Sequence, residues 1–139
     1  MENATQLIAA ATAREAGIVL LTVVAIAYGG TFLLRVVSGK FPTNALQKSF
    51  FRAGHAHAGV LVILGLVVGL FVDLAGVGGL PAQLSSGVLL AAILMPAGFF
   101  LSVIGRDPTK PNGLIALVWL GVASLTVGVV GAAVGLLTV

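Results

Sequence analysis

The sequence contains no cysteine, and only 8% of its 139 residues are charged. The absence of cysteine excludes disulfides, thiolate metal sites and cysteine nucleophiles. A soluble domain carries about 25% charged residues, so this chain has too few to cover an apolar core with a polar surface. Apolar residues instead make up 59% of the chain, and 19 residues are glycine. This composition excludes a soluble globular protein and a disordered chain, and it indicates an integral membrane protein.

Four long apolar stretches divide the chain, and charged residues occur only close to their ends. A charge at the centre of a bilayer costs at least about 2.5 kcal/mol, so uncharged interiors are typical of membrane-spanning helices. No stretch alternates apolar and polar residues as a membrane strand would. We therefore predict an all-α membrane protein, a single domain over residues 1–139 built as an antiparallel bundle of four transmembrane helices. The predicted spans cover about residues 16–38, 55–75, 86–104 and 113–138.

The segments between these spans carry the signals of loops and helix ends. Ser38–Gly54 is the longest, and its apolar residues predict a short helix lying on the membrane surface. Ala75–Ser86, which contains Pro81, is expected to be a glycine-rich turn. In Arg106–Asn112, two prolines end one helix, and Asn112 can cap the next.

The basic residues indicate the orientation in the membrane. Six of the seven lysines and arginines lie in the first and third loops or, as Arg35 does, at their border. The positive-inside rule then places these loops in the cytoplasm and both termini outside, in a multi-pass protein of a bacterial-type plasma (inner) membrane. Because the basic residues are scattered rather than clustered with aromatics, nucleic acid is not an expected partner. Residues Asn3–Ala13 are expected to extend the first helix outward.

Small residues recur at helical spacing within the spans and predict close helix packing. In the last span they are Gly121, Ser124, Gly128, Gly131 and Gly135. For the second and third spans, packing inside the bundle is the favoured interpretation. For the last span, contact with a second copy is equally favoured, so beside the lipid bilayer we expect a homo-oligomer or a larger membrane complex. Pro96, in the middle of the third span, indicates either a packing kink or a hinge.

His55 and His57 are the candidates for chemistry, because ionisable groups within a membrane are functional hypotheses by default. Three roles are open to them: anchoring at the membrane interface, binding haem or a metal, and forming part of a proton or substrate pathway. At 100° per residue they project about 200° apart, so a regular helix cannot direct both to one metal ion. With no cysteine and no third histidine, a closed zinc site within one chain is not expected.

The segment His55-Ala56-His57, followed by the small and aliphatic residues 58–65, resembles a span-opening segment of the haem-copper oxidase and nitric oxide reductase superfamily. The similarity is to subunit I-like proteins, which include small four-span relatives. It implies that His55 or His57 ligates haem iron. The resemblance covers about a dozen residues, and the later histidine clusters of that superfamily are absent, so it does not imply reduction of oxygen or nitric oxide. The rest of the chain resembles small bacterial membrane proteins.

Three function classes follow. The first is a non-catalytic membrane protein that binds haem or a metal through His55 or His57 and is linked to respiration. The second is a small oligomeric transporter or channel, and the third is an accessory subunit of a larger complex. An enzyme is least favoured, because no nucleophile–base pair or paired carboxylates can be assembled. Of the acids near the outer end, Asp73 is expected to cap a helix end or to pair with Arg14, and Glu15 to be solvated.

Overall fold

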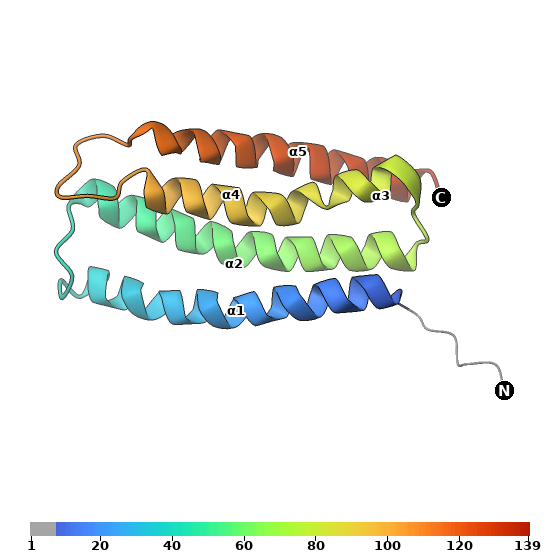
Figure 1. Ribbon diagram of the computed structural model, residues 1–139, viewed down its shortest axis with the longest axis horizontal. Helices are drawn as coiled ribbons and strands as arrows, with labels where there is room; N and C mark the ends of the chain where they lie inside the picture. The colour runs from blue at the N-terminus through green and yellow to red at the C-terminus, as the bar shows by residue number, and fades with distance from the viewer. Residues whose placement is uncertain (1–7) are drawn as a thin grey trace.

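The computed structural model describes residues 8–139, and within that range every regular element is a helix (Figure 1). The elements in chain order are α1 (Ala10–Val37), α2 (Ala45–Leu74), α3 (Gly79–Ser85), α4 (Gly87–Leu101), the 3-10 turn η1 (Gly113–Ile115) and α5 (Ala116–Leu137). Four stretches are long and apolar enough to cross a membrane, because α3 with α4, and η1 with α5, each make one span. The predicted all-α four-helix bundle is confirmed, and the chain is a multi-pass membrane protein.

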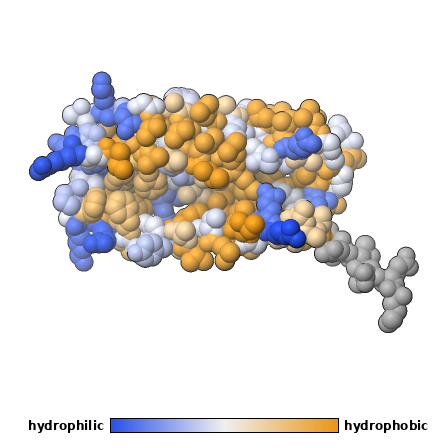
Figure 2. Space-filling model, in the orientation of Figure 1, coloured by the Kyte–Doolittle hydropathy of each residue, from blue (hydrophilic) through white to orange (hydrophobic). Residues whose placement is uncertain are grey.

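The long helices lie side by side, and their connections alternate between the two ends of the bundle (Figure 1). Apolar side chains cover the middle of the molecule, while the hydrophilic ones gather toward the ends (Figure 2). We call the end that holds the loops 38–44 and 102–112 the basic end, because six of the seven lysines and arginines lie in these loops or on the helix turns that adjoin them. The opposite end, where α1 begins and α5 ends, holds Glu15 and Asp73 and is called the acidic end.

Helix α2 begins at Ala45, so the prediction of a separate surface helix before a span at residue 55 is wrong. Asn44 and Gln47 form a capping box in which each side chain accepts a hydrogen bond from the other's backbone N–H. Gln47 is also buried, and its Nε2 donates to the carbonyls of Val103 and Gly105. These two carbonyls lie in the loop after α4. The hydrogen bonds to them therefore keep the first turns of α2 packed against the bundle.

The segment predicted as a glycine-rich turn contains a helix, α3, so that expectation is also wrong. Gly76 and Gly79 have φ of 68° and 65°, a conformation that suits glycine. They allow the chain to reverse direction between α2 and α3 within a few residues. Pro81 then falls in the first turn of α3, where no helical N–H is needed. The third span therefore starts at Gly79 rather than near residue 86.

The remaining helix ends lie close to their predicted positions. Asn112 caps η1 as expected, since its Oδ1 accepts from the backbone N–H of Leu114 at 2.8 Å. It also closes α4, because its backbone N–H donates to the carbonyl of Ser102 and its Nδ2 to that of Leu101. α4 therefore ends at Leu101, a few residues before the predicted end of that span. Of the expected N-terminal extension, residues 10–13 are helical, and residues 3–7 lie outside the described range.

Helices α4 and α5 pack most closely, through the small residues predicted for the last span. A Cβ at Gly128 would lie 2.6 Å from the backbone nitrogen of Val88, and Gly121 faces Met95. Ser124 donates to the carbonyl of Gly87 at 2.8 Å and so joins the two helices rather than bonding back within its own. Nearer the acidic end, α3 continues this packing against the last glycines of α5. The small-residue face of α5 is therefore used inside the chain, and the expectation that it contacts a second copy is not supported.

Helix α1 lies at the edge of the bundle and contacts α2 alone among the other helices. Of its described residues only Val36 is buried, in a cluster with Phe51 of α2 and Val103 at the basic end. Phe32 packs edge-on against Phe51, which strengthens the same cluster. α1 is thus held firmly at the basic end and weakly along the rest of its length.

We predict that Gly128→Ala destabilises the protein by about 1–3 kcal/mol, because the added methyl group would meet backbone atoms of α4 that cannot move aside. Gly59→Ala is the matched control, since a Cβ at Gly59 meets nothing within 4 Å. Reversible unfolding in mixed micelles, followed by circular dichroism, measures both variants. Equal stability of the two variants would contradict this account of the α4–α5 contact.

Candidate functional site

The charged residues of α2 define the depth of the histidines in the membrane. Arg52 and Asp73 are 21 residues apart, or about 31 Å along a helix, which matches the hydrocarbon thickness of a bilayer. His55 and His57 lie three and five residues inside Arg52, so they sit just within the membrane at the basic end. Both belong to the regular part of α2 and are half-buried.

His55 faces α1, at the place where that helix has two successive glycines. A Cβ at Gly30 would lie 3.6 Å from Nε2 of His55, and one at Gly29 would lie 3.8 Å from Nδ1. The edge of the imidazole ring therefore rests against the α1 backbone. A haem iron bound at Nε2 would occupy the space that α1 fills, so His55 fits a haem ligand only if α1 moves away.

His57 faces α4 instead, with its ring 5.0 Å from that of Phe99, between centroids. Its Nδ1 lies 2.7 Å from the carbonyl oxygen of Ala53, and because a carbonyl can only accept, Nδ1 carries the proton. In the neutral ring, Nε2 then has a free lone pair. A backbone carbonyl that orients one ring nitrogen in this way is common for histidines that bind a metal through the other.

The two histidines thus lie against different helices, as the 200° separation predicts, and they do not form one site. Met95 offers no partner to either of them, because it is buried in the core with Leu61, Ala91 and Val118. Among the described residues, no group of three or more histidine, aspartate or glutamate side chains lies close enough to hold a metal ion.

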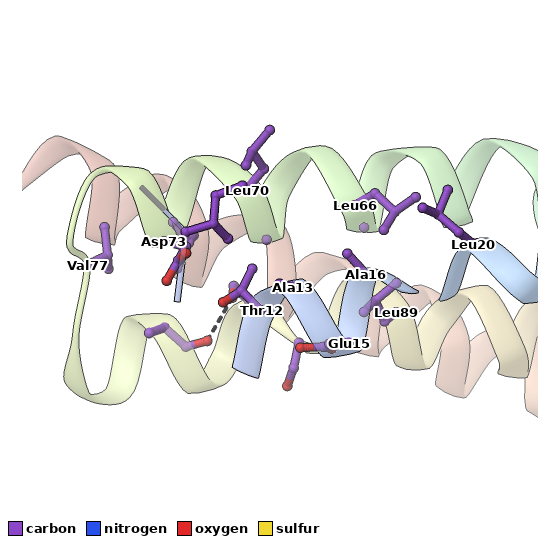
Figure 3. A pocket seen from close by; sticks show the side chains of 17 residues that line it. Thr12, Ala13, Glu15, Ala16, Leu20, Leu66, Leu70, Asp73, Val77 and Leu89 are labelled. Carbon is purple, nitrogen blue, oxygen red and sulfur yellow. Dashed lines mark hydrogen bonds between the residues drawn. The ribbon is translucent and has the colours of Figure 1, made fainter. Parts of the chain in front are cut away.

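A cavity of about 450 Å³ lies at the acidic end, between α1 and the helices α2, α3 and α4 (Figure 3). We call it the acidic cavity, because Glu15 of α1 and Asp73 of α2 both line it. Leucine side chains from α1, α2 and α4 form its deeper wall, which reaches Leu20 and Gly65. Sequence reasoning missed this site. It treated the two acids separately, although their positions at the same end of neighbouring helices were a signal that they are close.

A second cavity, of about 400 Å³, continues along α1 toward the basic end and is lined by His55. We call it the histidine cavity. Its other walls are apolar except for Thr22, whose hydroxyl donates to the carbonyl of Val19 in its own helix. Leu89 of α4 lines both cavities and therefore lies between them. On α2 the boundary between the two cavities falls between Val62 and Gly65, midway between Arg52 and Asp73 and hence near the middle of the membrane.

Asp73 also fastens the beginning of α1. Its Oδ2 accepts a hydrogen bond from the backbone N–H of Ala9, the residue that precedes the first helical turn, at 2.8 Å. The prediction that Asp73 caps a helix end is therefore correct, although the helix that it caps is α1 rather than its own. Glu15 is exposed, as expected, but it stands at the edge of the acidic cavity.

Comparison with protein-family models, with curated proteins and with solved structures gives no match for this chain. The function must therefore be argued from the site itself.

We predict that Asp73→Ala loosens the first turns of α1 by about 0.5–2 kcal/mol, the usual value of a capping hydrogen bond, because Ala9 loses its acceptor. Asp73→Asn keeps an oxygen at the same place and serves as the control. Amide hydrogen exchange of residues 9–13 measures the effect. Unchanged exchange in Asp73→Ala would show that the hydrogen bond does not hold α1.

Proposed function

We propose that the protein is a small transporter that binds an amphiphilic solute beneath α1 and passes it along that helix across the membrane. The observation that carries this proposal is the pair of cavities that follow one another along α1 on either side of Leu89, near the middle of the membrane. A pathway through a bundle requires such cavities, whereas a bundle that only packs or anchors has no need of them. The surface in Figure 2 is hollowed along this line, between α1 and α2.

The packing of α1 supports this proposal. A transporter opens one cavity at a time, which requires an element that moves at low energetic cost. α1 buries little of its surface against the other helices, so displacing it exposes few apolar groups to a new environment. The cluster of Val36 and Phe51 would act as the pivot for a movement of α1. At the other end of α1, a single side-chain hydrogen bond to Asp73 holds the helix.

The absence of native cysteine makes this pathway testable with single-cysteine variants. We expect Ala16→Cys, in the acidic cavity, and Ala25→Cys, in the histidine cavity, to react at least about tenfold faster with a charged methanethiosulfonate reagent than Val24→Cys, because thiolate forms in water and not in lipid. Val24 is the matched control, since it is exposed on α1 and lines neither cavity. Labelling of sealed vesicles from each side is the measurement.

Residue 16 should react from the acidic end and residue 25 from the basic end. If all three variants react at the same slow rate, lipid fills both cavities and the transport proposal fails.

A second candidate function is haem binding, favoured by the hydrogen bond that leaves Nε2 of His57 free. His57 would hold the haem iron through Nε2, and haem held there would supply electron transfer linked to respiration. The described residues place no second ligand beside it. A second protein ligand to the iron would therefore have to come from another copy of the chain.

For this candidate we expect the purified protein to show a Soret band that is lost in His57→Ala and kept in His55→Ala. Reconstitution with added haem, followed by absorption spectroscopy, makes the comparison. A colourless protein that takes up no haem would eliminate haem binding, and loss of the band in His55→Ala alone would assign the ligand to the other histidine.

A further inference from the structure

We propose that the acidic cavity selects lipophilic cations, that is, molecules with one positive charge on a largely apolar body. This inference rests on the proposed function, because it names the class of solute that would enter the pathway from the acidic end. It begins from the distribution of charge. The whole chain has four acidic residues, and two of them, Glu15 and Asp73, line this one cavity. Within residues 8–139, none of the 17 residues that line it is lysine, arginine or histidine.

The two carboxylates come from different helices and border the same space (Figure 3). One oxygen of Asp73 accepts from Ala9, which leaves the other to face a ligand. Arg14 precedes Glu15 on α1 but does not line the cavity, so its charge is directed elsewhere. Asp73 is half-buried beside apolar walls, so its field is screened less than in water, and Glu15 at the edge of the cavity adds a second negative charge that attracts cations.

The other polar side chains among the described lining residues are the neutral hydroxyls of Thr12, Ser85 and Ser86. Ser85 donates to the carbonyl of Ala82, and Ser86 donates to that of Gln83. The carboxylates are therefore the polar groups best placed to recognise a ligand. A neutral or anionic solute would lose hydration on entering without gaining an equivalent partner.

The walls require the rest of the ligand to be apolar. Leu20, Leu66, Leu70 and Leu89 surround the deeper part of the cavity. Its volume of about 450 Å³ lies within the range of sites that hold small organic molecules. A small inorganic cation would leave these walls without contacts, whereas an organic cation satisfies both the walls and the carboxylates.

The test compares two probes of similar shape and opposite charge, tetraphenylphosphonium and tetraphenylborate, binding to the full-length protein in nanodiscs. We expect tetraphenylphosphonium to bind at least about tenfold more tightly, and Glu15→Gln and Asp73→Asn each to weaken its binding about threefold to tenfold. Both substitutions preserve side-chain shape, and Asp73→Asn keeps the acceptor for Ala9. Asp107→Asn is the control, because Asp107 lies in the loop at the basic end.

Two further variants separate failure of this inference from failure of the transport pathway. Gly69→Phe projects a ring into the acidic cavity without meeting nearby atoms at Cβ, and it should abolish binding of the cation. Bound tetraphenylphosphonium should also slow the labelling of Ala16→Cys. Equal affinity for the two probes, or unchanged affinity in both carboxylate variants, overturns the selectivity for cations while leaving a water-accessible pathway intact. If Ala16→Cys is itself no more reactive than Val24→Cys, the pathway fails together with the inference.

Discussion

The close approach of the α4 and α5 backbones is the contact on which the rest of the arrangement depends. In a bilayer, apolar side chains gain little by leaving lipid for a helix interface, so helices associate where their backbones can come near one another. Gly121 and Gly128 of α5 allow this contact, and Ser124 adds an interhelical hydrogen bond. The two helices form a closely packed pair, and α2 joins it where Gly65 faces Leu89 and Gly54 faces Phe99 and Phe100.

Helix α1 lacks such a face over most of its length, and the two cavities follow from that difference. Its glycines at positions 29 and 30 allow an approach to α2 only around His55. Aliphatic side chains along the remainder keep α1 apart from α4, and the space between them is left as the acidic and histidine cavities. The same lack of close packing that leaves α1 at the edge of the bundle therefore creates the sites to which a function can be assigned.

The spans could be predicted from the sequence because their apolar length depends only on local composition. The start of α2 could not, because Gln47 is held by carbonyls 56 and 58 residues further along the chain. For the histidines, too, part of the structure could be predicted from the sequence and part could not. Helical geometry alone placed His55 and His57 on different faces, but it could not reveal that one meets the glycines of α1 and the other meets Phe99. Nothing local to Glu15 or Asp73 indicated a shared cavity.

The sequence by itself determined that this chain lies in a membrane as four helices, that its basic residues gather at one end, and that two histidines lie just inside that end. These properties depend on hydropathy and on the regular rise and turn of a helix, both of which act over neighbouring residues. Only the tertiary structure decided which helices pack closely and which stands apart, because that choice depends on small residues meeting across different helices. The cavities beside α1, and the position of Glu15 and Asp73 in the lining of one of them, are consequences of that choice.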